Sequence, residues 1–259
     1  MDNATILRAA MQQSALELNC RAEDFLSTEN VTVVSAANAG ARKYLQLPFE
    51  CALVSYGNNV VASVNAEIAD KVSAYISMFD GYRCFETPNL HVLNDFLQTR
   101  GLRVCFMAEY FLPDLNLLKK LPCAYQIKML RKRDFEGLYT PQWSNALCKD
   151  RKELDEFGFG AYDNGKLIGF AACSADCENM RQIGVDVLPE YRRRGVASAL
   201  TSALAEEILS IGKIPFYCAA WSNIKSVRNA IKCGFYPAWT EVTAKTTEFT
   251  DSINKHIVL

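Results

Sequence analysis

The sequence predicts an α/β (α+β) fold with an additional N-terminal α/β domain. Runs of alternating apolar and polar residues, typical of strands, are interspersed with runs of helical periodicity. The turn Asp163-Asn164-Gly165 separates two apolar runs, and Asn-Gly in this setting is a strong hairpin signal. At 259 residues the chain exceeds one average domain and suits two, each large enough to bury its own core.

The N-terminal domain is predicted over residues 1–115. Gly57-Asn58-Asn59 supplies turn chemistry between two β-branched runs. Thr87 and Pro88 form a typical helix start, with Thr87 as the cap, and Gly101 ends this helix. The predicted elements are a helix over residues 4–18, a strand over 31–34, a hairpin over 52–64, the helix from Thr87 and a buried strand over 102–111. No motif in this block indicates its role.

The second domain is predicted over residues 123–259. Pro113 and Pro122 bracket a leucine-rich stretch, which places the boundary between residues 112 and 122. The expected elements are a strand over residues 124–130, a helix from about Asp134, a hairpin over 157–173, and then strand, helix, strand, helix and strand.

The stretch between residues 182 and 208 carries the strongest functional signal. Apolar residues alternate with Gln182, Gly184 and Asp186, which predicts a strand with one buried face. A helix is expected to begin at about Gly195 and to pack one apolar stripe on the sheet. The apolar strand residues are Ile183, Val185 and Val187, and the helical stripe is Val196, Leu200, Leu204 and Ile208. The turn between them points a helix N-terminus, with unpaired N–H groups and partial positive charge, toward an anion.

Two sequence motifs with characteristic residue spacing occur one after the other in this domain, each at a strand-to-helix junction. The first is Arg192-x-x-Gly195-x-Ala197, where x is any residue. The second is Asn223-x-x-Ser226, which opens a short helix closed by Gly234-Phe235, with Ile224, Val227 and Ile231 on one side. Together they resemble the cofactor-binding motifs of the GNAT superfamily, N-acyltransferases that take an acyl group from coenzyme A. The resemblance covers roughly residues 123–250 and implies a mixed, splayed sheet with helices on both faces.

The resemblance also implies a set of cofactor contacts. Backbone N–H groups of the turn would bind the pyrophosphate of acetyl-CoA, and strand main-chain groups would pair with the pantetheine arm. Asn223 would hydrogen-bond the pantetheine end, although a plain helix cap explains it equally well, and Ser226 would reach a phosphate. The implied cofactor-binding residues are Ile183, Val185, Val187, Arg192, Arg193, Arg194, Gly195, Val196, Ala197, Asn223 and Ser226.

A base is needed as well, because a free alkyl amine is mostly protonated at neutral pH. Relatives often place a carboxylate early on the central strand, where this sequence has Arg181. Asp186 and Glu178 are the nearest alternatives, and either is also explained as an ordinary surface carboxylate. We take Asp186 as the candidate base.

An acid to protonate the departing thiolate is missing from its usual place. Many relatives carry a Tyr seven residues after the motif Asn, and this sequence has Ala230 there. Tyr217 and Tyr236 are the candidates to replace it, with Tyr217 taken first. Both are equally explained as half-buried sheet aromatics. A thiol is a tolerable leaving group even without an acid.

Composition narrows the classes of function further. Lys and Arg number 28 and Asp and Glu 29, which argues against broad nucleic-acid binding and gives no electrostatic reason for membrane binding. No apolar run has the length of a membrane span and no signal peptide is recognisable, so a cytoplasmic protein is expected. The ten cysteines are scattered without a CxxC pair, and His91 and His256 are the only histidines; no metal site is expected.

We therefore expect a GNAT-type N-acetyltransferase that uses acetyl-CoA as cosubstrate and acts by direct attack of a primary amine. The acceptor is a small molecule or a peptide, which the sequence does not distinguish. The N-terminal domain would serve acceptor recognition or form a homodimer surface. The alternative is a non-catalytic acyl-CoA-binding or regulatory module, motivated by Ala230 and by the lack of an obvious base.

Overall fold

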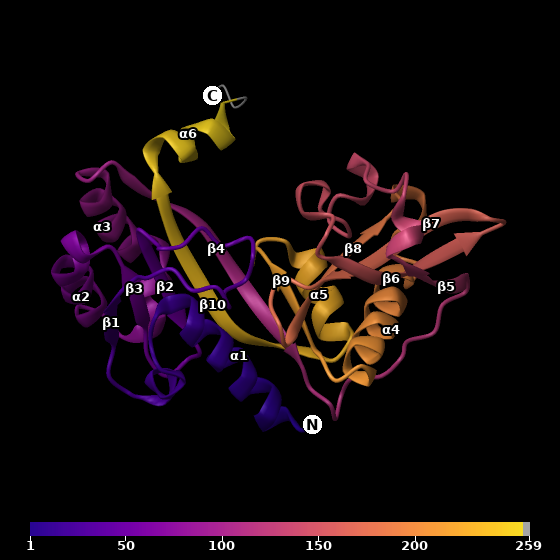
Figure 1. Ribbon diagram of the computed structural model, residues 1–259, viewed down its shortest axis with the longest axis horizontal. Helices are drawn as coiled ribbons and strands as arrows, with labels where there is room; N and C mark the ends of the chain where they lie inside the picture. Colours follow the sequence, from indigo (N-terminus) through magenta and orange to yellow (C-terminus); the bar gives the residue numbers. More distant parts are fainter. Residues whose placement is uncertain (256–259) are drawn as a thin grey trace. The chain divides into compact units, whose positions relative to one another are not determined.

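The computed structural model describes residues 1–255, and His256 with the residues after it lies outside the described part. The chain divides into two compact units, each made of two segments. Unit 1 comprises Met1–Leu7 and Tyr110–Pro237, and unit 2 comprises Arg8–Glu109 and Ala238–Leu259. The segments can be followed by colour in Figure 1, from indigo at the N-terminus to yellow at the C-terminus.

Two long strands contribute to both units. β4 (Leu102–Pro113) and β10 (Phe235–Thr246) each have twelve residues, and a unit boundary falls inside each of them. Thus β10 supplies Phe235 to the core of unit 1 and Val242 to the core of unit 2. The boundary predicted between residues 112 and 122 lies near the crossing in β4. The crossing in β10 has no turn or proline cluster to mark it, because the strand continues without a break.

Unit 2 contains most of the N-terminal block. Its helices and strands are α1 (Asn3–Leu18, all but its start), β1 (Val31–Val34), β2 (Cys51–Ser55), β3 (Val61–Val64), α2 (Ala69–Ser77), α3 (Thr87–Gln98) and α6 (Thr247–Asn254), with 3-10 turns at Ala22–Leu26, Ala66–Ile68 and Gly81–Phe85. The strand order is β1-β3-β2-β10-β4. β1 and β3 are parallel, whereas β2 is antiparallel to β3 and β10. The first helix, the first strand and the hairpin expected in this block are confirmed.

Unit 1 contains a six-stranded mixed sheet. Its elements are β5 (Gln126–Arg131), β6 (Asp155–Asp163), β7 (Lys166–Ser174), β8 (Met180–Val187), α4 (Val196–Ser210), β9 (Ile214–Ala219) and α5 (Ile224–Lys232), with 3-10 turns at Lys132–Phe135, Pro141–Trp143, Lys149–Arg151 and Pro189–Tyr191. The order is β4-β9-β8-β7-β6-β5. Neighbours from β5 to β8 are antiparallel, and β8 and β9 are parallel. The predicted mixed sheet with flanking helices is confirmed.

Strands β8 and β9 separate halfway along β8. β8 stays paired with β7 as far as Val187, opposite Gly169, but its pairing with β9 ends at Ile183, opposite Tyr217. The C-terminal half of β8 therefore has an open edge on its β9 side. This is the splay that the resemblance implied.

Helix α4 covers one face of the unit 1 sheet and carries the predicted apolar stripe. It packs on β6, β7, β8 and β9, and α5 packs against it (Figure 1). The stripe residues Val196, Leu200, Leu204 and Ile208 are all buried. Gly169 marks the same face, because a Cβ added there would meet the side chains of Val196 and Leu200.

Four details of the sequence-based expectation were wrong. No α-helix lies between Asp134 and β6; three short 3-10 turns occur before β6, and Gly137 with φ 81° and Pro141 interrupt any continuous helix. In α5, Ile224 and Ile231 are exposed, and Val227 with Ala230 forms the buried face instead. β4 is buried only at its ends. Thr87 is the first residue of α3, so Glu86 rather than Thr87 occupies the cap position.

Candidate functional site

The turn between β8 and α4 presents the start of a helix without protein partners above it. Gly195 is the N-cap residue with φ 81°, a left-handed conformation that glycine adopts without steric cost. An added Cβ at Gly195 would meet nothing within 4 Å. The first helical hydrogen bond runs from the N–H of Ala199 to the carbonyl of Gly195 at 3.0 Å. The N–H groups of the first turn, Val196 and Ala197 among them, are therefore available to an anion.

The three arginines of this turn have different roles in the structure. Arg192 Nε donates to the carbonyl of Val187 at 3.0 Å and so ties the turn to the end of β8. Arg194 donates to the hydroxyl of Tyr125 at 2.9 Å and lies over the ring of Tyr191, 5.4 Å from its centroid. Arg193 is exposed and has φ 61°, which is uncommon for a residue with a Cβ.

None of these three guanidinium groups forms an ion pair with a carboxylate within residues 1–255. The turn thus combines three positively charged side chains with the positive end of a helix dipole, although Asp163 and Glu190 are close enough to Arg194 to interact with its charge. Both features favour a ligand with several negative charges, such as a diphosphate.

The open edge of β8 begins beside this turn. The N–H of Leu188 donates to Ile168 on β7 at 2.9 Å, so by alternation the main-chain groups of Ile183, Val185 and Val187 point away from β7. Ile183 is at the last pair with β9, and the carbonyl of Val187 already accepts from Arg192. Val185 lies between them, beyond the end of the β9 pairing. An extended ligand chain could add to this edge as a further strand does.

The second motif lies at the start of α5, on the same side of the sheet as α4. The side chain of Asn223 accepts from the N–H of Ser226 at 3.3 Å, so Asn223 is a helix cap here. The hydroxyl of Ser226 lies 2.7 Å from that of Tyr217 on β9. Sequence reasoning had singled out these three residues for separate roles, and the structure brings them together.

Asp186 anchors a loop to the face of β8 opposite α4. Its carboxylate accepts hydrogen bonds from the backbone N–H of Asn145 at 2.9 Å, the Nδ2 of Asn145 at 2.6 Å and the N–H of Ala146 at 3.0 Å. Gly184 allows this loop to approach closely, since a Cβ there would lie 1.8 Å from the carbonyl oxygen of Asn145. In this structure the carboxylate of Asp186 therefore holds the Asn145 loop in place.

Tyr217 and Tyr236 differ in their surroundings. Tyr217 is buried, and burial raises the pKa of its hydroxyl, with the hydrogen bond to Ser226 acting in the opposite direction. Tyr236 is half-buried, and burial together with the charge of Asp114 raises its pKa. Ala230 is fully buried between α5 and the sheet, so no polar group occupies that position. Both tyrosines therefore carry their proton at neutral pH.

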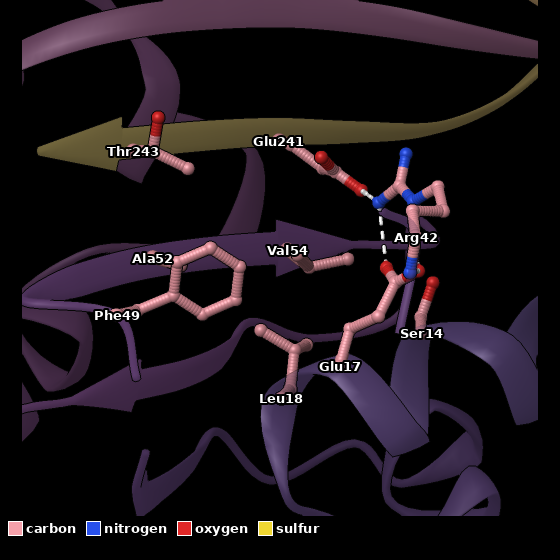
Figure 2. Close-up of a pocket in the computed structure, with 9 residues that line it drawn as sticks. All are labelled: Ser14, Glu17, Leu18, Arg42, Phe49, Ala52, Val54, Glu241 and Thr243. Atoms are coloured by element: carbon pink, nitrogen blue, oxygen red, sulfur yellow. Dashed lines mark hydrogen bonds and ion pairs between the residues drawn. The ribbon is translucent and has the colours of Figure 1, made fainter. Parts of the chain in front are cut away.

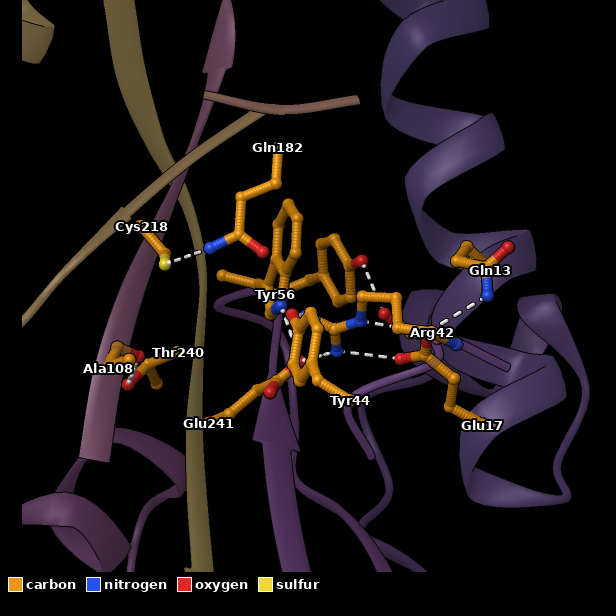
Figure 3. Close-up of polar contacts among 12 residues, drawn as sticks. Gln13, Glu17, Arg42, Tyr44, Tyr56, Ala108, Gln182, Cys218, Thr240 and Glu241 are labelled. Carbon is orange, nitrogen blue, oxygen red and sulfur yellow. Dashed lines mark hydrogen bonds and ion pairs between the residues drawn. The ribbon is translucent and has the colours of Figure 1, made fainter. Parts of the chain in front are cut away.

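Two neighbours of the site were not singled out by the sequence reading. Gln182 on β8 donates through Nε2 to the Sγ of Cys218 on β9 at 3.1 Å (Figure 3). Its Oε1 is buried and has no hydrogen-bond partner among the described residues. The alternation along β8 places Gln182 on the same face as Asp186, but no local pattern reveals that its amide oxygen is left without a donor.

Unit 2 contains a separate buried polar cluster around Arg42. The guanidinium pairs with Glu17 at 2.6 Å and with Glu241 at 2.5 Å, and it donates to the hydroxyl of Tyr44 at 2.7 Å (Figure 3). Glu241 also accepts from the indole N–H of Trp239 at 3.0 Å. A cavity of ≈ 10 Å³, large enough for about one water molecule, lies beside the cluster (Figure 2). The cluster joins α1, the loop before β2 and β10.

Within residues 1–255 no group of three or more His, Cys, Asp or Glu side chains is arranged to hold a metal ion. In the same part of the chain, no helix is both long and apolar enough to cross a membrane.

Comparisons with known proteins bear on the segment that carries the turn. A sequence model of the GNAT acetyltransferase family matches residues 101–239. A comparison with curated proteins gives no match. Solved structures resemble parts of the chain. A GCN5-related N-acetyltransferase-like protein of Streptococcus suis is 20% identical over 62% of this chain and 69% of that protein, with a TM-score of 0.44.

Two other solved structures show similar levels of likeness. A GCN5-related N-acetyltransferase of Kribbella flavida is 14% identical over 60% of this chain and 63% of that protein, with a TM-score of 0.47. The yncA protein of Salmonella typhimurium, solved with its cofactor acetyl-CoA, is 17% identical over 48% of this chain and 94% of that protein, with a TM-score of 0.37. The chain thus spans about two thirds of the length of the Streptococcus and Kribbella proteins.

Proposed function

The chain belongs to the GNAT acetyltransferase family, and from this premise we propose that it transfers the acetyl group of acetyl-CoA to a primary amine by direct attack. One observation carries the proposal. The uncovered start of α4, with three arginines free of carboxylate partners, lies directly after the open edge of β8. A diphosphate and an extended amide-containing arm, the two polar parts of coenzyme A, match these two features in the same order.

The residues present fit acetyl-CoA in two respects. The first-turn N–H groups of α4 suit the diphosphate, and Gly195 leaves the space above them open. The main-chain groups of Val185 suit an amide of the pantetheine arm. Asn223 and Ser226 keep their structural hydrogen bonds, so any contact with the cofactor would be additional to capping α5 and to the bond with Tyr217.

Acetyl-CoA supplies an activated acyl group on a thiol leaving group. The tasks of this chain are to hold it, to accept the proton of the attacking nitrogen and to donate a proton toward the sulfur. Tyr217 is the candidate for the last task because its hydroxyl is protonated at neutral pH, and its hydrogen bond to Ser226 provides a path along which that proton can be replaced. Asp186 is the candidate for the second task, and to serve it must give up part of its bonding to the Asn145 loop.

The proposal is tested by binding and turnover on the full chain. Calorimetry should detect acetyl-CoA binding, and thiol release should depend on an added primary amine. If Tyr217 is the proton donor, Tyr217→Phe should lower turnover by ~10²-fold with little change in acetyl-CoA affinity, whereas Tyr236→Phe should not. Reduced turnover only in Tyr236→Phe would assign the donor to Tyr236. Normal rates in both would mean that the thiolate leaves without a tyrosine.

A non-catalytic acyl-CoA-binding module is the second candidate. It is favoured by the buried, non-ionisable Ala230 and by the full hydrogen bonding of Asp186. This candidate predicts that acetyl-CoA binds to the chain but that added amines cause no release of thiol.

A further inference from the structure

The amide oxygen of Gln182 is an unsatisfied acceptor in the interior of unit 1. Its Oε1 has no donor among the described residues, while the Nε2 of the same amide donates to Cys218 at 3.1 Å (Figure 3). Buried polar atoms in folded proteins are almost always hydrogen-bonded, so each exception calls for an explanation. A donor that arrives with a ligand is one such explanation.

The position of Gln182 in the sheet suggests which ligand brings that donor. Gln182 lies opposite Phe216, one residue before Ile183 and Tyr217, the last pair before β8 and β9 separate. Gln182 is therefore next to the apex of the splay. An acetyl-CoA whose diphosphate lies at α4 and whose arm follows the open edge of β8 has its thioester directed toward this apex.

The two faces of the sheet are not equally accessible near the apex. Val187 and Gly169 face α4, so by alternation Ile183 does too, and Gln182 points to the opposite face. The α4 face is filled: Val227 and Ala230 of α5 are buried there, and Tyr217 is bonded to Ser226. A second substrate is therefore expected on the face on which Gln182 lies, beside the Asn145 loop that covers Gly184.

We propose that Oε1 of Gln182 accepts a hydrogen bond from the attacking primary amine and so defines the acceptor-nitrogen site. This inference rests on the proposed function and adds to it the residue that receives the acceptor. A neutral primary amine has two N–H groups and one lone pair. One N–H can bond to Oε1 while the lone pair points to the thioester carbon.

In the reaction the C–N bond forms and the C–S bond breaks, and the electron pair of that bond leaves with the sulfur. One proton is lost from the nitrogen and one is gained by the sulfur. Gln182 takes neither proton, since an amide is not a base at neutral pH. Its effect is on the position of the nitrogen alone.

The test replaces Gln182 by Met, which keeps the length of the side chain and removes the acceptor. The matched control is Gln126→Met, at an exposed position of β5 in the same unit. Thiol release from acetyl-CoA is measured with benzylamine, spermidine, glucosamine and N-acetyl-lysine methylamide as probes. For the probe that the unaltered chain uses best, we expect Gln182→Met to lower kcat/KM for the amine at least tenfold. Acetyl-CoA affinity should stay within about twofold, and the control should match the unaltered chain.

Stability gives an independent readout that does not depend on the acceptor. Because Oε1 is buried without a partner among the described residues, its removal should not destabilise the fold, but Gln182→Met also removes the Nε2 bond to Cys218. The melting temperature of Gln182→Met should therefore fall no further than that of Cys218→Ala, which removes the same bond. A clearly larger decrease would show that Oε1 is satisfied in the free protein and would overturn the inference.

The kinetic outcomes separate this inference from the proposed function. An unaltered chain that releases thiol with an amine, together with an equally active Gln182→Met variant, overturns the role of Gln182 and leaves the transferase intact. An unaltered chain that binds acetyl-CoA but releases no thiol with any of the four probes overturns the transferase. In that case the role of Gln182 is overturned with it.

Discussion

Arginine occurs in two contrasting settings in this chain. In unit 2, the guanidinium of Arg42 is 4% exposed and lies between the carboxylates of Glu17 and Glu241. In unit 1, Arg192, Arg193 and Arg194 are on the surface without a carboxylate partner within the described residues. Their bonds go to a backbone carbonyl and to tyrosines instead. The same side chain thus serves the fold in one unit and is left available to a ligand in the other.

The contrast follows from the cost of removing charge from water. A buried guanidinium must be paired, so the carboxylates around Arg42 compensate it and cannot attract an external anion. An exposed guanidinium is hydrated at little cost, and the turn can hold three of them close to a helix N-terminus without an ion pair among the described residues. The structural site and the candidate binding site therefore differ in whether their arginines are paired with carboxylates, not in how many arginines they contain.

Removing the buried arginine should have the largest effect. Arg42→Met would leave Glu17 and Glu241 facing each other without a cation, which should cost ~3–5 kcal/mol of the free energy of unfolding. The matched control is Arg21→Met, whose side chain is 76% exposed and 3.8 Å from Glu23; a change below ~1 kcal/mol is expected there. Urea unfolding monitored by circular dichroism measures both. Equal losses of unfolding free energy in the two variants would show that the buried cluster contributes no more to stability than the exposed ion pair does.

A buried carboxylate with a raised pKa extends the comparison to acids. Asp155 is 1% exposed, and burial raises its pKa to about 6, although hydrogen bonds from Tyr139 and Cys148 and the charge of Arg151 act in the opposite direction. The folded state therefore holds a proton that the unfolded chain releases near pH 4. Folding stability should fall as pH rises from about 4 to about 6, because only the unfolded state ionises freely in that range.

Asp155→Asn should remove this dependence. Relative to the unaltered chain, the variant should gain stability between pH 4 and pH 7, on the order of 2–3 kcal/mol in all. Unfolding free energies at pH 4, 5, 6 and 7 measure the difference, and Asp150→Asn, at an exposed position, serves as control. A constant difference across this pH range would show that Asp155 titrates normally.

Sequence predicted the turn well because its signals are local. The alternation before Val187, the glycine at position 195 and the apolar stripe of α4 lie within about one strand and one helix of each other. The open edge of β8 was expected only through the resemblance, since strand separation depends on pairing between distant segments. The same holds for the role of Asp186, whose donors on Asn145 and Ala146 are about 40 residues away in sequence.

Other features could not be predicted from periodicity. The apolar residues of α5 show that a helix is present but not which side faces α4, so Ile224 and Ile231 were placed on the wrong face. The second crossing between units lies inside β10, where no turn interrupts the strand. The absence of a donor for Gln182 Oε1 results from all of its neighbours together.

Gly195 allows a matched test of the turn as a ligand site. Gly195 and Gly137 both have φ 81°, and an added Cβ would meet nothing within 4 Å at either. Valine at either position should strain the backbone to a similar extent, about 1–2 kcal/mol. Only Gly195→Val should also weaken acetyl-CoA binding, by at least ~2 kcal/mol, because the side chain would fill the space above the first-turn N–H groups. Calorimetry on both variants decides this, and unchanged affinity in Gly195→Val would remove the turn as the binding site.

The smallest expected effect concerns Arg193, the arginine of the turn that is exposed and has a left-handed backbone. Arg193→Ala should weaken acetyl-CoA binding by about 0.5–1 kcal/mol, as expected for one exposed charge contact, and should reduce the salt dependence of binding. Arg193→Gly should weaken binding equally but raise the melting temperature, because glycine relieves the cost of φ 61°. Arg133→Ala, with a side chain that is 86% exposed elsewhere in unit 1, should change neither quantity. If Arg193→Gly lowered the melting temperature and left acetyl-CoA affinity unchanged, Arg193 would, like Arg42, stabilise the fold rather than bind the ligand.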